Sequence, residues 1–201
     1  FYIVGAKASN VIDVPDLKGA RVAVSRNTVI DYCVDMALRS AGIDPAQVSK
    51  VEINKIPVRF EMLRSGQIDA TGLPYPLALL AAVSGDRIVT SNTQLGFGIT
   101  GIMFSGKAIE EKGEQIRLMY RAYNMGVRYL SEHGVNGVSG LLKEEMGFTD
   151  ETLKLTVLNT YAQAGLPEER DLRQAADWLA GRKLVQPDFQ VREQLDGRVL
   201  E

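Results

Sequence analysis

A run of four polar residues, Ser25, Arg26, Asn27 and Thr28, has the side chains and the position needed to hold an anion. The run follows a short apolar segment over 21–24 and precedes a segment over 29–40 in which apolar side chains recur at helical spacing. The start of a helix leaves backbone N–H groups without partners and carries a partial positive charge, so anions bind there readily. We therefore predict that these four residues contact a ligand. The alternative is that Ser25, Asn27 or Thr28 only caps the helix.

A second set of candidate ligand-binding residues lies at the end of another apolar segment, over 68–73, and consists of Gly72, Leu73, Pro74 and Tyr75. If both apolar segments are strands of one parallel sheet, both sets lie at its carboxyl edge, where open α/β sheets bind ligands. Arg26 would then pair with an anion. Gly72 would let the backbone approach the ligand, and Tyr75 would offer a ring face and a hydroxyl. The alternative for Tyr75 is packing in a hinge.

Alternating strands and helices are expected to position these residues. The apolar runs predict strands over 1–5, 21–24, 48–53, 68–73 and 87–90, and helices over 29–40, 57–65 and 74–83. Such alternation is typical of a parallel sheet with right-handed crossovers. In the helix over 57–65 we expect Val58 and Met62 to point inward, and Arg59 and Arg64 outward. Beyond residue 94 the pattern predicts a strand over 99–104, followed by helices around 116–130, 141–146, 152–163 and 172–181.

Composition excludes several classes of function. The chain has 201 residues, and a net charge of −2 makes nucleic acid an unexpected partner. One cysteine, Cys33, and one histidine, His133, do not predict a zinc site or a Cys–His pair. The sequence shows no Ser-His-Asp set and no phosphate-binding glycine motif. We therefore predict no catalytic residue, no metal and no cofactor. Because the chain starts without Met, directly in a strand-like run, we expect a processed chain or a fragment.

Four segments resemble, in order, the solute-binding proteins of ABC importers. They are DLKGARVAV, GQIDATGLPYP, GITGIMFSGKAIEEKGEQIRLMYRAYNMGVRYL and AADWLAGRKLVQPDFQVREQLDGRVL. The resemblance is to the type II group that binds nitrate, sulfonates, taurine or thiamine precursors. It implies an α/β fold class: a periplasmic-binding-protein type II lobe, with a parallel-rich sheet and helices on both faces, plus the mainly helical C-terminal part of the other lobe.

The same resemblance implies how the chain is divided. Residues 12–95 would form a complete α/β lobe. Residues 1–11 and 96–201 would supply hinge strands and C-terminal helices of the first lobe, whose N-terminal part is absent, because members of the family usually have a long stretch before the DLKG segment. Tyr75 stands where members often carry an acidic residue, which argues against an amine ligand.

The function that the resemblance implies is solute capture. Such a protein binds a small anionic or planar organic solute, such as nitrate, a sulfonate, taurine or a pyrimidine, by hinge closure and delivers it to an ABC permease in the membrane. It would be a monomer without enzymatic activity, free in the periplasm or lipid-anchored outside the inner membrane.

Two other classes share this fold. One is the effector-binding domain of a transcription regulator, which would need a DNA-binding segment in front. The other comprises pyrimidine-pathway and menaquinone-pathway enzymes, which would need a titratable residue in the cleft. His133 precedes Gly134 at an expected helix end, where a histidine interacts favourably with the helix dipole.

Overall fold

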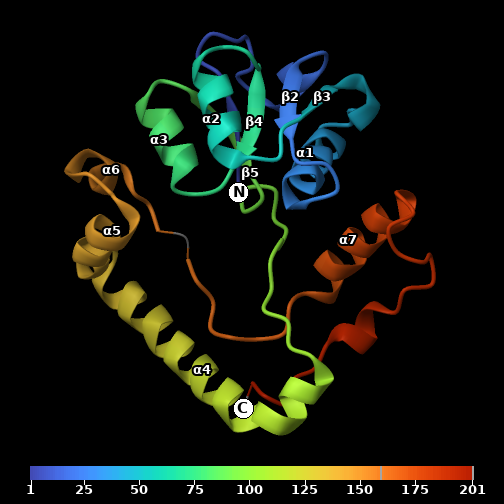
Figure 1. Ribbon diagram of the computed structural model, residues 1–201, viewed down its shortest axis with the longest axis vertical. Helices are drawn as coiled ribbons and strands as arrows, with labels where there is room; N and C mark the ends of the chain where they lie inside the picture. The colour runs from blue at the N-terminus through green and yellow to red at the C-terminus, as the bar shows by residue number, and fades with distance from the viewer. Residues whose placement is uncertain (159, 201) are drawn as a thin grey trace. The chain divides into compact units, whose positions relative to one another are not determined.

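The structure is a computed structural model that describes residues 1–158 and 160–200 (Figure 1). The chain forms two compact units. Unit 1 comprises Phe1–Ile99 together with Trp178–Leu184, and unit 2 comprises the rest of the described chain. The two units are described separately below.

Unit 1 is built on a five-stranded sheet with the order β3-β2-β4-β1-β5. The strands are β1 (Tyr2–Gly5), β2 (Arg21–Val24), β3 (Ser49–Glu52), β4 (Ala70–Leu73) and β5 (Arg87–Ser91). β2 runs parallel to both β3 and β4, whereas β1 runs antiparallel to both β4 and β5. Four strands therefore point in one direction and β1 in the other. The predicted placement of β2 and β4 in one parallel-rich sheet is confirmed.

Helices cover both faces of this sheet (Figure 1). α1 (Val29–Ser40) packs on one face, while α2 (Ile56–Arg64) and α3 (Leu77–Val83) pack on the other. The strand period of two explains the division: Val22 and Val24 enter the core beneath α1, and Ala23 enters the core beneath α2 and α3. The predicted α/β fold class is confirmed. Short 3₁₀ turns, η1 (Val14–Leu17) and η2 (Pro45–Gln47), complete the connections.

The first strand belongs to this sheet. β1 lies between β4 and β5, with Ile3 in one core and Val4 in the other. An apolar run without polar alternation suits a strand that is buried on both faces. Unit 1 therefore spans more than the predicted lobe over 12–95, because it also includes residues 1–11, residues 96–99 and the segment Trp178–Leu184.

Unit 2 is mainly helical, as predicted. It contains α4 (Gly106–His133), α5 (Ser139–Met146), α6 (Asp150–Leu155) and the first part of α7 (Glu169–Gly181), with 3₁₀ turns η3 (Val135–Val138) and η4 (Val191–Gln194). No helix among the described residues is both long and apolar enough to span a bilayer.

Two predicted elements differ in the structure. Residues 99–104 form no strand, and Met103 is 92% exposed, so this apolar run is not buried as a strand of a sheet would be. The helix predicted over 152–163 ends at Leu155, and residues 156–158 and 160–163 are not helical; residue 159 lies outside the described residues. At this end the Thr156 hydroxyl donates to the carbonyl of Thr152 at 2.7 Å. Side-chain bonds of this kind compete with the backbone pattern that would continue the helix.

Candidate ligand-binding site

Both predicted sets of ligand residues follow strands that end at the carboxyl edge of the unit 1 sheet. β2 and β4 are parallel neighbours with Ala23 opposite Thr71, so the loops after Val24 and Leu73 begin side by side. The loop after β3 reaches the same edge, where the Ile53 N–H donates to the Val24 carbonyl at 2.9 Å. Three loops therefore surround one end of the sheet.

The start of α1 has no side-chain cap at its N-cap residue, Thr28. The Thr28 hydroxyl instead donates to the Ser25 carbonyl at 2.7 Å, which shapes the loop. Neither Ser25 nor Thr28 is engaged in the helix capping that was the alternative to ligand binding. The first N–H groups of α1 keep the partial positive charge that attracts anions.

Asn27 has a structural role in this loop. Its φ of 59° is left-handed, a conformation that asparagine tolerates better than most residues. Its N–H donates to Asp31 Oδ2 at 2.9 Å, and its side-chain oxygen accepts a hydrogen bond from Arg182 Nη1 at 2.9 Å. The side chain is thus held by the residue that follows α7.

Arg26 is directed along β3. Its Nη2 donates to the Lys50 carbonyl at 3.3 Å, and its Nε lies 3.8 Å from a carboxylate oxygen of Glu52. Both side chains of this ion pair are about half exposed, at 48% and 51%. The charge of Arg26 is therefore shared with an acidic neighbour and with water.

The second set of predicted residues is divided between the core and the edge. Leu73 is fully buried among residues beneath α2 and α3. A Cβ atom at Gly72 would lie 2.7 Å from Ile30 Cγ2, so glycine is needed there for α1 to pack on β4. Pro74 and Tyr75 stand at the edge, where the Tyr75 ring lies 6.2 Å from the ring of Tyr2.

The prediction that Arg59 points outward is wrong. Arg59 is only 1% exposed, and its Nη1 donates to Ser25 Oγ at 2.8 Å and to the Ile53 carbonyl at 2.7 Å. Val58, predicted to point inward, is 43% exposed. Periodicity placed the charged residue on the solvent face, but it could not show that a hydroxyl and a carbonyl from two neighbouring loops would receive the guanidinium.

No ion pair joins Arg59 to a carboxylate in the described part of the chain. Its Nε is buried and has no hydrogen-bond partner among those residues. Burial lowers the pKa of Arg59, because removal from water disfavours the charged form. A buried cation with only neutral partners thus stands behind Ser25 at the carboxyl edge.

A second buried group, which we call the ion cluster, consists of Asp31, Asp35, Lys50 and Arg182. Arg182 bridges the two carboxylates, with its Nη1 2.6 Å from Asp31 Oδ2 and its Nη2 2.7 Å from Asp35 Oδ2. Lys50 Nζ also pairs with both carboxylates. Burial alone would raise the pKa of Asp31, but hydrogen bonds from Lys50, Asn27 and Arg182 outweigh it and lower the pKa.

Trp178 completes the ion cluster. Its indole Nε1 donates to Asp35 Oδ2 at 2.9 Å, and the Arg182 guanidinium lies 4.0 Å from the centre of its ring. The sequence analysis missed this cluster, although the i, i+4 spacing of Asp31 and Asp35 within an apolar helix face was a usable signal. Two carboxylates balance two cations, so the cluster needs no further ion.

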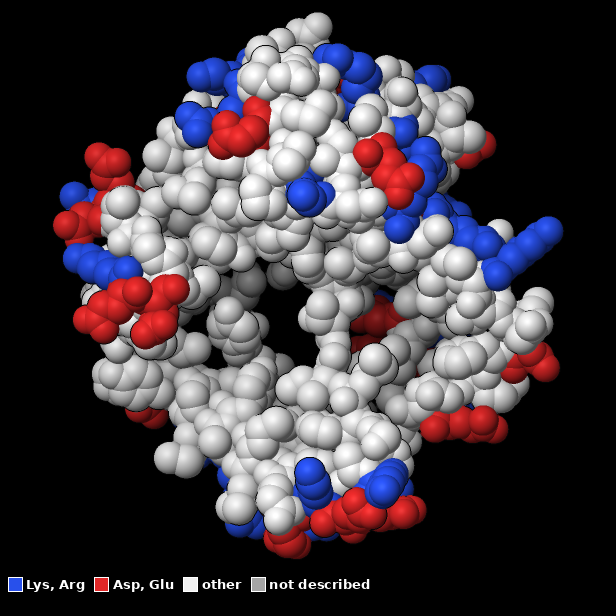
Figure 2. All heavy atoms as spheres, in the orientation of Figure 1, with Lys and Arg blue, Asp and Glu red and all other residues white. Residues whose placement is uncertain are grey.

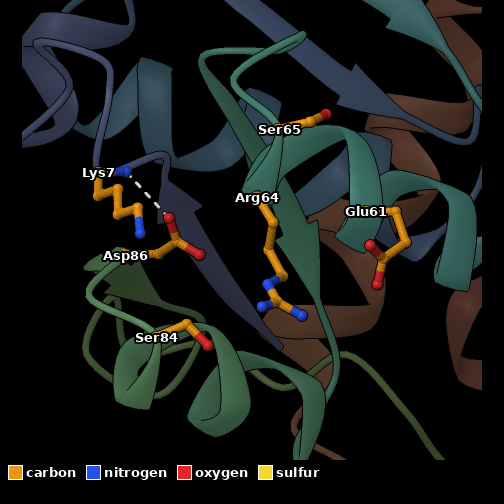
Figure 3. Close-up of a pocket in the computed structure, with 6 residues that line it drawn as sticks. All are labelled: Lys7, Glu61, Arg64, Ser65, Ser84 and Asp86. Atoms are coloured by element: carbon orange, nitrogen blue, oxygen red, sulfur yellow. Dashed lines mark hydrogen bonds between the residues drawn. The ribbon is translucent and has the colours of Figure 1, made fainter.

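A polar pocket of about 310 Å³ lies at the opposite, amino edge of the sheet. It is lined by Lys7, Glu61, Arg64, Ser65, Ser84 and Asp86 (Figure 3). Figure 3 shows Lys7 and Asp86 together on one side, where the Lys7 N–H donates to Asp86 Oδ1 at 2.9 Å. Two cations and two carboxylates line this pocket, so it offers a ligand no net charge.

The face drawn in Figure 2 does not single out a charged partner. On the face drawn in Figure 2, Lys and Arg side chains are interspersed with Asp and Glu, without a broad area of one sign. The described residues include no group of three or more His, Cys, Asp or Glu side chains able to hold a metal ion.

Comparison with known proteins identifies a relative of this chain. A protein of Brachyspira hyodysenteriae, assigned as an ABC transporter periplasmic binding protein, is 31% identical over 112 residues. That match covers 55% of this chain and 32% of the relative, so the matched part is about a third of the relative's length.

Solved structures show the same fold. The periplasmic aliphatic sulphonate binding protein SsuA from Escherichia coli matches with a TM-score of 0.78 at 19% identity, covering 99% of this chain and 69% of that one. The desulfurization enzyme DSZB matches with a TM-score of 0.63 at 13% identity, covering 99% of this chain and 74% of that one. The fold by itself therefore does not separate binding from catalysis. The family model described as NMT1/THI5 like matches residues 1–136, which is more than half of the sequence, and the chain belongs to that family.

Proposed function

We propose that the chain is part of the substrate-binding component of an ABC-type importer. It captures a small anionic or planar organic solute, of the nitrate, sulfonate, taurine or pyrimidine kind, by hinge closure and delivers it to a membrane permease. The observation that carries this proposal is the meeting of the uncapped start of α1 with the β4–α3 loop at one sheet edge, in a chain of this family.

The solute binds at the carboxyl edge of the unit 1 sheet. The candidate residues remain Ser25, Arg26, Asn27, Thr28, Gly72, Leu73, Pro74 and Tyr75. Ser25, Thr28 and Tyr75 are best placed to touch the solute, while Asn27, Gly72 and Leu73 shape the loops that present them. Helix starts and carboxyl edges of parallel strands are common ligand positions because their backbone N–H groups point outward.

The partners and the location follow from the proposed role. We expect a monomer that works in the periplasm, free or lipid-anchored outside the inner membrane, and that contacts the permease when loaded. The relative from Brachyspira hyodysenteriae supports this role through its assignment. Capture and release require neither a cofactor nor a catalytic residue.

Calorimetric titration of the full chain tests the proposal. The solutes are a panel of alkanesulfonates, taurine, nitrate, carboxylates and pyrimidines, and we expect saturable binding of at least one anionic or planar member. Product analysis after long incubation with each solute is the second measurement. Binding without conversion supports a binding protein. Steady conversion of a solute, abolished by Ser25→Ala, would assign the chain to the enzymes that share this fold.

A further inference from the structure

We propose that Arg59 is the residue that makes this site selective for anions. The negatively charged group of the solute rests on Ser25, and Arg59 supplies the opposite charge from behind the hydroxyl. This inference rests on the proposed function, because it names the chemical class of the solute that the carboxyl edge accepts.

The first argument is the cost of a buried, uncompensated charge. Transfer of an ion out of water is unfavourable unless an opposite charge and hydrogen bonds replace the lost hydration. Arg59 is 1% exposed, yet its hydrogen bonds from Nη1 go only to a hydroxyl and a carbonyl. Its Nε has no acceptor among the described residues. An anion resting on Ser25 at the carboxyl edge would supply the opposite charge that Arg59 lacks.

The second argument is the geometry of Ser25. Its Oγ accepts a hydrogen bond from Arg59 Nη1 at 2.8 Å, which fixes the position of the hydroxyl. The hydroxyl's own proton has the Asn54 carbonyl as a partner at 3.4 Å, well beyond the usual O–H···O length. Ser25 can therefore turn its proton toward a ligand while it keeps the bond from Arg59.

The third argument is that the nearby carboxylates are already engaged. Asp31, in the first turn of α1, is held by Lys50 and Arg182. Glu52, at the end of β3, lies near Arg26. The charge of Arg59 adds to the partial positive charge at the start of α1, so both act in the same direction on an anion.

The test uses the full chain and sodium sulfate as the probe. Thermal melting is followed over a sulfate series in which sodium chloride keeps the ionic strength constant. The variants are Arg59→Met, which removes the charge, and Arg59→Lys, which keeps it. The matched control is Arg64→Met, an exposed arginine on the same helix. Circular dichroism before each series establishes that the variant is folded.

We expect a saturable rise of melting temperature with sulfate in the wild type and in Arg64→Met. Loss of the positive charge behind the hydroxyl should weaken the apparent affinity of Arg59→Met roughly tenfold or more, and Arg59→Lys should keep part of it. Equal sulfate affinity in Arg59→Met and the wild type would overturn the inference, as would a wild type without a saturable response. If Arg59→Met is unfolded, Arg59→Gln, which also removes the charge but can still donate hydrogen bonds, takes its place: a sulfate affinity equal to that of the wild type overturns the inference.

A matched pair of organic probes separates this inference from the proposed function. Ethanesulfonate carries the charge, and ethyl methyl sulfone has a similar shape without it. Preference for ethanesulfonate in the wild type, lost in Arg59→Met, supports the inference. Equal binding of both probes refutes charge selectivity and leaves solute capture standing. A sulfate response that depends on Arg59, with no organic solute bound, supports the anion site and counts against the transport role.

Discussion

Unit 1 buries charge in two places that are built in opposite ways. In the ion cluster, Asp31 and Asp35 meet Lys50 and Arg182 within hydrogen-bonding distance, so two negative charges face two positive ones. At the carboxyl edge, the hydrogen bonds of Arg59 to described residues go to Ser25 and to a backbone carbonyl. Both groups lie beside the loop over 25–28, but only the ion cluster is neutral by itself.

This difference separates a structural role from a binding role. A closed set of ions holds segments together, because the removal of any member leaves its partners buried and unpaired. The ion cluster holds residues 178–184 against α1 in this way. A buried cation without a carboxylate partner contributes little to holding segments together, and its charge can still attract an external anion. Substitutions within the ion cluster should therefore cost more stability than the loss of Arg59.

Asp35→Ala should have the largest effect on stability. The substitution leaves Lys50 and Arg182 to share Asp31, and it removes the acceptor of the Trp178 indole. We expect a loss of about 3–5 kcal/mol in the free energy of unfolding, measured by urea denaturation. The control is Glu52→Ala, whose exposed ion pair with Arg26 should be worth less than about 1 kcal/mol. Similar losses of unfolding free energy in both variants would mean that the ion cluster contributes no more to stability than an exposed ion pair.

Arg182→Lys should have a smaller effect, because it keeps the charge. Arg182 bonds to both carboxylates and to Asn27 through its planar fork, a geometry that an ammonium group cannot reproduce. We expect a loss of about 1.5–3 kcal/mol in the urea experiment. Arg39→Lys, at an exposed position in the last turn of α1, serves as the control and should be nearly neutral. If Arg182→Lys left the free energy of unfolding unchanged, charge alone would be enough to hold the ion cluster together.

Acid should weaken the ion cluster within a defined range of pH. The folded-state pKa of Asp31 lies below its ordinary value of 3.8, so its stabilising contribution is complete above pH 3.8 and is lost as the pH falls through the folded value. The difference in melting temperature between the wild type and Asp31→Asn should therefore stay constant from pH 7 to pH 5 and shrink below pH 3.8. A difference that persists in strong acid would place the effect of Asp31 in packing instead of charge.

The sequence predicted the elements of unit 1 better than the side chains that act between them. Each of the five strands is predicted by an apolar run, which is a property of the local sequence, and β2 has the predicted bounds. Arg59 could not be placed in this way, because its partners lie in the loops after β2 and β3, and only the folded sheet brings them together. The ion cluster depends on a still longer separation, since Arg182 lies 147 residues from Asp35. Local periodicity holds no information about such contacts.

Arg59→Met should have the smallest effect on the stability of the ligand-free chain. The substitution breaks the bonds from Arg59 to Ser25 and to the Ile53 carbonyl, a loss of about 1.5–3 kcal/mol each because the donor is charged. It also removes the cost of holding an uncompensated cation out of water, which acts in the opposite direction. A methionine side chain is unbranched and flexible, so it can occupy most of the space of the buried arginine stem. We expect the free energy of unfolding in urea, without sulfate or solute, to change by less than about 1 kcal/mol. A loss of unfolding free energy as large as that of Asp35→Ala would show that Arg59 is a structural cation like those of the ion cluster. The charge of Arg59 would then not be available to bind a ligand at the carboxyl edge.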